Sequence, residues 1–369
     1  MTLRLIREKG FGAIAIEGDW PEAERVNRWI RGMGDDASAE QALSGFQGFP
    51  TWMWANQEFR DLAVELREHN GRLPPGDRAG LYGLDLYELW GAADAVVAAL
   101  DRLDPPAAAR ARQRYRCFAS YREDPHLYGR SVAANPKRSC EAQVRDQWQE
   151  LERWMEAERP RAGPERREEL FSLARNARVV RAGEAYYRTV YRGGLSPWNV
   201  RDQHMADTLD EIAEHLGEGG NPPRVVVWAH NTHLGDARVT EMGEGGEWNV
   251  GQLMRQRHDG SAVLVGFTTY EGTVMAASAW GERGRVKELR PALPGSYAAL
   301  FHASGAGDFL LVLRGSEAGR HLAGPLLQRA VGVVYLPRQE RRHYFQARLT
   351  QQFDAVIHLD RTVAVTPLR

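Results

Sequence analysis

The chain has 369 residues, a formal net charge of −1 and a hydrophobic fraction of 43%. This composition is typical of a globular protein and excludes a collagen-like or disordered chain. The balanced charge does not indicate nucleic acid or a membrane as a partner, and no run of 18 apolar residues occurs. The N-terminus has no apolar stretch of signal-peptide length. Because secreted chains more often carry several cysteine pairs, two cysteines (Cys117 and Cys140) favour a cytoplasmic protein.

Short apolar runs that close on polar residues predict buried parallel strands. The first two runs, residues 12–16 and 79–84, lead directly into Glu17 and Asp85. Between them, the pattern over residues 58–69 predicts a helix that ends at Asn70-Gly71. The order strand, helix, strand is typical of a parallel sheet with helices on its faces. Five more strands are predicted at residues 224–228, 262–267, 309–313, 332–335 and 355–359.

The pattern changes to long helices rich in Ala, Arg, Glu and Gln between about residues 92 and 215, with breaks near Asp124-Pro125 and Gly193-Gly194. We interpret this segment as a helical insertion over one edge or mouth of the sheet. No disordered linker separates the part that follows. The prediction is therefore a single α/β domain over residues 1–369, with a mostly parallel central sheet flanked by helices and a helical cap subdomain.

Ionisable residues follow three of the predicted strands: Glu17, Asp85 and His230. Because ligands of open parallel sheets bind outside the carboxyl ends of the strands, we expect these groups to lie together. A second imidazole, His233, follows in the same segment. A histidine can accept a proton from water and return it, and a carboxylate partner can fix its tautomer. The alternative for each acid is a structural role as a helix cap or turn.

Five tryptophans could line an apolar pocket for a bulky ligand, although core packing explains most of them equally well: Trp20, Trp52, Trp54, Trp90 and Trp280. No serine hydrolase elbow, P-loop, Cys-x-x-Cys or dinucleotide fingerprint occurs, which leaves a mechanism that activates water without a protein nucleophile. The arginine-rich stretch of residues 153–178 carries interleaved acids and predicts a solvated helix face. The candidate substrate-binding residues are Asp19, Trp20, Trp52, Trp54, Asp85 and Asn231.

Six segments across the chain resemble the erythromycin esterase family: residues 15–21, 49–54, 228–236, 249–253, 272–274 and 352–358. The resemblance implies an α/β fold with a helical cap and hydrolytic opening of a macrolide lactone by activated water without a required metal. It places Glu17 at the family's acidic site residue and His230 and His233 at its two histidines. The predicted function is hydrolysis of cyclic or bulky carboxylic esters, with these three residues as the catalytic group, a small-molecule ester or lactone as partner, and no cofactor.

Family members begin with an additional strand and a His-Gly motif with a nearby Glu, which supply the proposed general base. This chain starts at about the helix that follows the motif, and we expect a misplaced start codon ahead of a truly shortened protein. Two alternatives stay open. One is a metal-dependent hydrolase, because two histidines and two carboxylates suit a divalent ion. The other is a catalytically inactive, ligand-binding relative. Substrate, oligomeric state and antibiotic resistance do not follow from the motifs.

Overall fold

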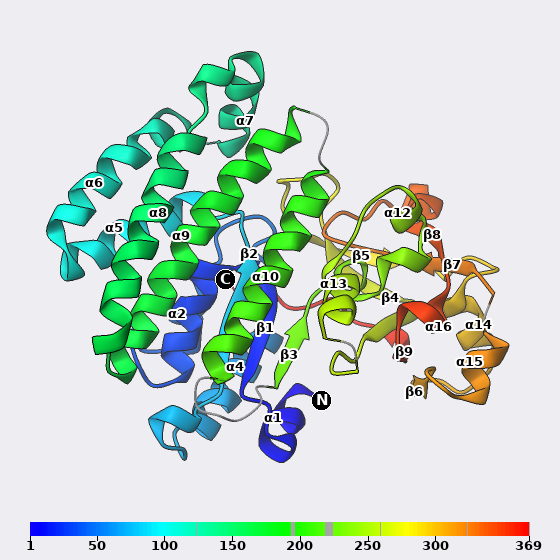
Figure 1. Cartoon of the computed structure of the whole chain (residues 1–369). Helices are drawn as coiled ribbons and strands as arrows, with labels where there is room; N and C mark the ends of the chain where they lie inside the picture. The colour runs from blue at the N-terminus through cyan, green and yellow to red at the C-terminus, as the bar shows by residue number, and fades with distance from the viewer. Residues whose placement is uncertain (123, 193–195, 218–223, 259, 323, 369) are drawn as a thin grey trace. The chain divides into compact units, whose positions relative to one another are not determined.

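A computed structural model describes residues 1–122, 124–192, 196–217, 224–258, 260–322 and 324–368. The chain forms two compact units, shown in Figure 1. The first comprises Met1–Asp35 and Leu66–Trp228, and the second comprises Asp36–Glu65 and the chain from Ala229 onward. The single domain expected over residues 1–369 stays a prediction. The α/β fold class with parallel strands and flanking helices is confirmed.

The first unit contains a three-stranded parallel sheet in the order β2-β1-β3. Its strands are β1 (Ala13–Asp19), β2 (Gly80–Asp85) and β3 (Val225–Trp228), which confirms three predicted strands. The side chains from Ala13 to Ile16 are completely buried, as expected for a parallel strand that is covered on both faces. Helices α2 (Trp20–Ile30) and α10 (Pro197–Gly217) pack against β2.

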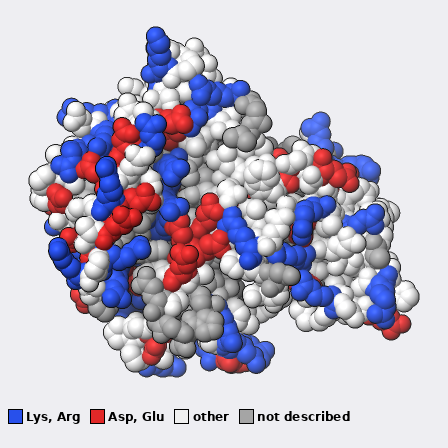
Figure 2. Space-filling view, in the orientation of Figure 1, with Lys and Arg blue, Asp and Glu red and all other residues white. Residues whose placement is uncertain are grey.

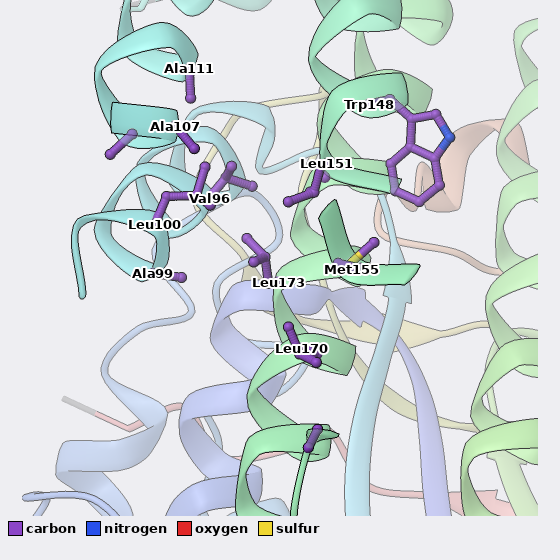
Figure 3. Packing of buried hydrophobic residues seen from close by; sticks show 13 residues of the cluster. Val96, Ala99, Leu100, Ala107, Ala111, Trp148, Leu151, Met155, Leu170 and Leu173 are labelled. Atoms are coloured by element: carbon purple, nitrogen blue, oxygen red, sulfur yellow. The ribbon is translucent and has the colours of Figure 1, made fainter. Parts of the chain in front are cut away.

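Helices follow one another from Leu89 to Gly217, and an apolar cluster holds several of them together (Figure 3). In this cluster Val96 of α5 faces Leu151 of α8 and Leu173 of α9. Asp124 caps α7 by accepting a hydrogen bond from the His126 amide at 2.8 Å, so the predicted break is confirmed there. The break predicted at Gly193-Gly194 lies outside the described residues. The helices are α5 (Leu89–Leu103), α6 (Pro105–Tyr115), α7 (Pro125–Ala134), α8 (Glu141–Glu158), α9 (Pro164–Val190) and α10.

Acidic and basic side chains alternate over the surface of these helices, on the left of Figure 2. Arg166, for example, contacts both Glu158 and Glu169, at 3.4 and 3.1 Å. This agrees with the solvated helix face predicted for residues 153–178. Arg175 is the exception: its side chain is 2% exposed and pairs with Glu211 of α10, and burial lowers the pKa of its guanidinium to about 9.

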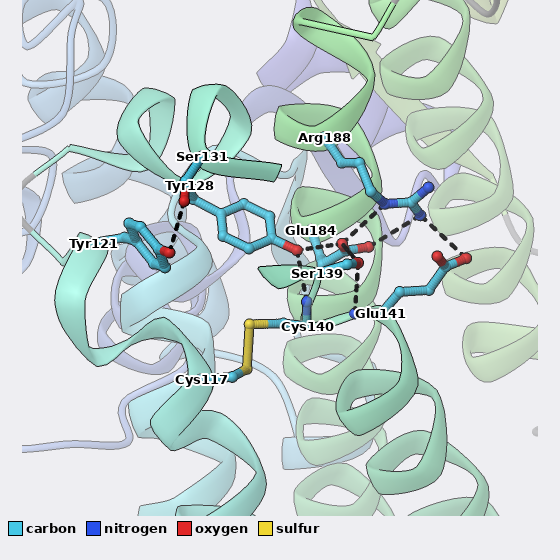
Figure 4. The surroundings of a disulfide bond; sticks show 9 residues. All are labelled: Cys117, Tyr121, Tyr128, Ser131, Ser139, Cys140, Glu141, Glu184 and Arg188. Carbon is cyan, nitrogen blue, oxygen red and sulfur yellow. Dashed lines mark hydrogen bonds and ion pairs between the residues drawn. A yellow bond between two sulfur atoms is a disulfide. The ribbon is translucent and has the colours of Figure 1, made fainter. Parts of the chain in front are cut away.

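A disulfide joins Cys117, in the 3-10 helix η2 (Arg116–Tyr121), to Cys140 at the start of α8 (Figure 4). Beside it, the Tyr128 hydroxyl accepts a hydrogen bond from the Cys140 amide at 2.9 Å and donates one to Glu184 at 2.5 Å. Arg188 binds the same Glu184 carboxylate. The cysteines lie 23 residues apart with α7 between them, so their pairing depends on how the helices pack.

The remaining elements of the first unit are helix α1, the end of helix α4 and three short 3-10 helices. The helix predicted over residues 58–69 is confirmed as α4, whose first half belongs to the second unit. These elements are α1 (Thr2–Lys9), α4 (Gln57–Asn70), η1 (Pro75–Asp77), η3 (Pro136–Arg138) and η4 (Arg159–Arg161).

The second unit contains a mixed sheet in the order β5-β4-β9-β6 and a two-stranded antiparallel sheet of β7 and β8. The predicted strands at 262–267, 309–313 and 355–359 are confirmed as β4, β6 and β9. The strand predicted at 332–335 is wrong, because this segment forms only an isolated bridge from Val334 to Ala277. Strands β5, β7 and β8 lack a strong apolar pattern and were not predicted. The strands are β4 (Val265–Ala276), β5 (Arg285–Leu289), β6 (Phe309–Val312), β7 (Leu326–Arg329), β8 (Tyr344–Ala347) and β9 (Ala355–Thr362).

One face of the mixed sheet is buried against a cluster that includes Tyr297, Phe301, Phe353 and Val356. The helices of this unit are short. They are α3 (Ala39–Leu43), α11 (Asn231–Leu234), η5 (Ala237–Val239), α12 (Glu241–Glu244), α13 (Val250–Arg257), α14 (Tyr297–Ala303), α15 (Glu317–His321), η6 (Pro337–His343) and α16 (Leu349–Gln352). In the described parts of both units, no helix combines the length and apolar character needed to cross a bilayer.

Candidate functional site

In the first unit, Arg201 of α10 binds two carboxylates at the carboxyl ends of adjacent parallel strands, Glu17 in β1 and Asp85 in β2. Its Nε and Nη2 atoms donate to the two oxygens of Asp85 at 2.9 and 2.5 Å, and Nη2 also donates to Glu17 at 2.7 Å. Burial by itself disfavours the charge on Arg201, but the charges of Asp85 and Glu17 outweigh it and raise the pKa of the guanidinium. The guanidinium also lies over the ring of Tyr87, 5.0 Å from the ring centroid.

A second group of carboxylates lies near Asp85. It consists of Asp19 at the end of β1, Glu22 on α2 and Glu88 at the start of α5. Asp19 accepts a hydrogen bond from the Glu88 amide at 3.0 Å, yet burial and the charges of Asp85 and Glu22 raise its pKa. Burial, followed by repulsion from Glu88, raises the pKa of Glu22 to about 7. One Glu22 oxygen is buried without a hydrogen-bond partner. The close approach of β2 to β1 depends on Gly83, because a Cβ at this position would lie 2.5 Å from the Asp19 carbonyl oxygen.

His204 lies one helical turn after Arg201 and holds the main chain of Asp85. One ring nitrogen bonds the Asp85 backbone, while the buried Nε2 has no hydrogen-bond partner. Burial and the nearby Arg175 lower the pKa of His204 to about 3, so the imidazole is neutral at physiological pH. Helix α10 therefore fixes both the side chain and the backbone of Asp85.

In the second unit, His230 precedes α11 and its ring orientation is defined by two contacts. Nε2 lies 3.2 Å from the carbonyl oxygen of Val331, and Nδ1 lies 2.8 Å from the Thr232 hydroxyl. A carbonyl can only accept, so Nε2 carries the hydrogen and Nδ1 is the basic nitrogen, to which the Thr232 hydroxyl and amide donate. The geometry thus selects one neutral tautomer of His230.

The segment that carries His230 is anchored by its neighbours. The Asn231 amide exchanges two hydrogen bonds with the main chain of Phe267, at 2.6 and 3.0 Å. Asn249 caps α13 and donates to the Thr232 carbonyl at 2.7 Å. Gly251 allows α13 to approach closely, since a Cβ there would lie 2.1 Å from the Leu234 carbonyl oxygen. These contacts explain the residues found at 249–253.

Asp236 ends this segment in a buried charge network. Arg238 binds its carboxylate through two hydrogen bonds, at 2.9 and 2.6 Å. Arg255 bridges it to Asp354, at 3.2 and 3.1 Å. Burial alone raises the pKa of Asp236, but Arg238 and Arg255 outweigh it and lower that pKa. The carboxylate therefore has a structural role in holding the turn after His233, which is itself 3% exposed.

The tryptophans proposed for substrate binding are all buried. Trp20 is 3% exposed and stacks on Tyr82 in the first unit, at a centroid distance of 5.8 Å. Trp52 and Trp54 belong to the second unit and are 5% and 8% exposed. Their proposed contact with substrate stays a prediction.

The structure brings some of the predicted site residues together within each unit. Glu17, Asp19 and Asp85 lie together in the first, and His230, Asn231 and His233 lie together in the second. Arg201, Glu22 and His204 were not predicted. The sequence offers only one signal for these three residues: each is an ionisable residue at a helical position that is expected to be buried. Among the described residues, no group of three or more His, Cys, Asp or Glu side chains is arranged to hold a metal ion.

Fold and side chains together define an α/β protein with ionisable residues at the carboxyl ends of parallel strands. A family model for erythromycin esterase matches residues 6–362. The chain therefore belongs to the erythromycin esterase family, whose members are carboxylic ester hydrolases.

Solved structures share the fold at low sequence identity. A succinoglycan biosynthesis protein is 19% identical, with a TM-score of 0.78 over 100% of this chain and 84% of its own. A Bacillus cereus protein is 17% identical, with a TM-score of 0.77 over 100% and 85%. A variant of the erythromycin esterase EreC in its open conformation is 15% identical, with a TM-score of 0.64 over 99% and 86%.

Proposed function

We propose that this chain hydrolyses cyclic or bulky carboxylic esters, of the macrolide-lactone type, by activating water. Membership of the erythromycin esterase family supports the reaction class. The observation that carries the proposal is the tautomer of His230, whose Nε2 hydrogen is held by the Val331 carbonyl while the basic Nδ1 accepts from the Thr232 hydroxyl, through which it can take up a proton from water. A main-chain carbonyl acting on the opposite ring nitrogen also strengthens the base.

In the proposed reaction, a water oxygen adds to the ester carbonyl carbon and His230 takes the proton that water releases. The carbon–oxygen bond of the ester then breaks, and the alkoxide leaves with a proton returned by the imidazole. The products are an acid and an alcohol, which for a lactone are one ring-opened molecule. His233 orients the water or the carbonyl. Glu17, which accepts a hydrogen bond from Arg201, is the acidic residue that we assign to the reaction. The chemistry uses no cofactor.

Mass spectrometry of a macrolide and ester panel after incubation with the chain tests this proposal, scored by the gain of one water. We expect turnover that is lost, by roughly 100-fold or more, in His230→Ala and reduced in His233→Ala and Glu17→Gln. His321→Ala is the matched control, because this histidine is 79% exposed. Turnover that survives His230→Ala contradicts the assignment of the base.

Two further arms separate the alternatives. Activity abolished by a chelator and restored by a divalent ion would show a metal-dependent hydrolase instead. Thermal stabilisation by a macrolide without any product would show a ligand-binding relative that lacks turnover. The cytoplasmic location and a role in macrolide resistance remain separate proposals, which cell fractionation and susceptibility assays would test.

A further inference from the structure

Trp280 is the exposed member of an aromatic cluster in the second unit. Its side chain is 59% exposed, whereas Trp52 is 5% exposed. The ring of Phe49 connects them, with its centroid 4.8 Å from that of Trp280 and 5.4 Å from that of Trp52. An exposed indole that rests on the partly buried Phe49, which in turn rests on the buried Trp52, presents a large apolar surface of fixed orientation.

The turn that carries Trp280 is firmly held. The Lys287 ammonium donates to the carbonyl oxygen of Ala277 at 2.6 Å, to the Ser278 hydroxyl at 3.0 Å and to the carbonyl oxygen of Tyr335 at 2.6 Å. On the other side of the turn, Gly284 lies against Trp52, since a Cβ at this glycine would be 2.7 Å from the indole ring. The Trp280 surface is therefore organised before any ligand binds, which limits the entropy lost on binding.

The same short segment of chain supports both Trp280 and His230. The Val331 carbonyl accepts the hydrogen bond from His230. Two residues later, the Val333 carbonyl accepts a hydrogen bond from the Ala277 amide at 2.8 Å. Two residues of extended chain span roughly 7 Å, and Trp280 lies three residues beyond Ala277. The segment from Val331 to Val333 therefore places His230 and the turn of Trp280 in the same part of the second unit.

We propose that Trp280, backed by Phe49, binds the apolar face of a bulky ester and so determines the preference for substrate size. This inference rests on the proposed function, because His230 defines where the ester bond lies. A macrocyclic lactone offers a broad aliphatic surface to the indole ring. A small ester offers the indole ring little apolar surface.

The test compares erythromycin with p-nitrophenyl acetate as probes, in wild type, Trp280→Ala and Trp280→Phe. For Trp280→Ala we expect KM for erythromycin to rise roughly 5- to 20-fold with kcat little changed. The loss of kcat/KM should be smaller for p-nitrophenyl acetate, and Trp280→Phe should recover part of the erythromycin value. Leu310→Ala is the matched control, because this side chain is also 59% exposed in the second unit.

Equilibrium dialysis of erythromycin against His230→Ala, with and without Trp280→Ala, separates this inference from the proposed function. Binding that weakens roughly 5- to 20-fold on loss of Trp280 supports the inference even if no variant turns substrate over, in which case the proposed function alone fails. Turnover of erythromycin with KM and Kd unchanged in Trp280→Ala overturns the inference and leaves the function standing. If wild type neither binds nor hydrolyses erythromycin, the inference is overturned, and the macrolide and ester panel decides the proposed function.

Discussion

Arg201 and Asp85 form a bidentate ion pair, with Nε to Oδ1 at 2.9 Å and Nη2 to Oδ2 at 2.5 Å. Their side chains are only 11% and 5% exposed. A guanidinium matches a carboxylate in this planar geometry, whereas an ammonium cannot. Because Nη2 also binds Glu17, one cation balances the acids at the carboxyl ends of β1 and β2.

Replacing Arg201 should destabilise the protein because it leaves two acids close together in a buried site. We expect Arg201→Met to lower the free energy of unfolding by about 3–5 kcal/mol, and Arg201→Lys by less. Urea denaturation at neutral pH measures both effects. Arg4→Met provides the control, since Arg4 is exposed and its pair with Glu8 should contribute little. Equal stability of the Arg201→Met and Arg4→Met variants would contradict the prediction.

Glu22 should make stability depend on pH. Its pKa is raised from 4.5 to about 7 by burial and by Glu88, so the folded state binds more protons than the unfolded state between these values. The contribution of Glu22 to stability is therefore fully present below about pH 4.5 and is lost as the pH rises through about 7. The shift corresponds to about 3 kcal/mol, which partial exposure reduces to about 1–2 kcal/mol.

Glu22→Gln cannot ionise, so this variant should gain about 1–2 kcal/mol over wild type between pH 5 and pH 8. Urea denaturation midpoints at several pH values report the difference. The exposed Glu68→Gln serves as the comparison. A Glu22→Gln curve parallel to that of wild type across this range would sink the idea.

Asn231 should contribute to stability through its two hydrogen bonds to the Phe267 main chain. We expect Asn231→Ala to cost about 1–2 kcal/mol, because it leaves an amide and a carbonyl without these partners. Asn231→Asp should cost at least as much at neutral pH, since one carboxylate oxygen would then face the Phe267 carbonyl. Chemical denaturation tests both variants against the exposed Gln346→Ala, and no loss in either would argue against this role.

The disulfide between Cys117 and Cys140 should stabilise the helices of the first unit. For a loop of this length, with the cysteines 23 residues apart, we expect Cys117→Ser with Cys140→Ser to lower the free energy of unfolding by about 2–4 kcal/mol. Reductant should destabilise wild type and leave the double variant unchanged. Thiol titration of the unfolded, unreduced protein should find no free thiols; finding two would contradict the bond. The same titration on trapped cell extracts bears on the expected cytoplasmic location, where thiols stay reduced.

Much of the architecture follows from local patterns. The apolar runs before Glu17 and Asp85 predict β1 and β2, and amphipathic spacing predicts α4, because burial of a strand or helix face requires these periods. Strand β5 escapes prediction because its exposed charged residues leave no apolar alternation. Strands β7 and β8 escape prediction because each is only four residues long and contains no more than two consecutive large apolar residues. The segment 332–335 shows the opposite error. Its apolar run predicts a strand, but only Val334 forms a β-bridge, so no strand results.

The sequence by itself determined that Glu17 and Asp85 lie at the carboxyl ends of two strands, and that His230 and His233 share one turn, because these are relations between residues close in the chain or at equivalent strand ends. Tertiary structure alone decided what surrounds them. Arg201 lies 116 residues from Asp85 and 184 from Glu17, and only packing of α10 on β2 brings its charge to both. Likewise, whether a tryptophan is buried like Trp52 or exposed like Trp280 depends on distant elements that cover it, and no local pattern records them.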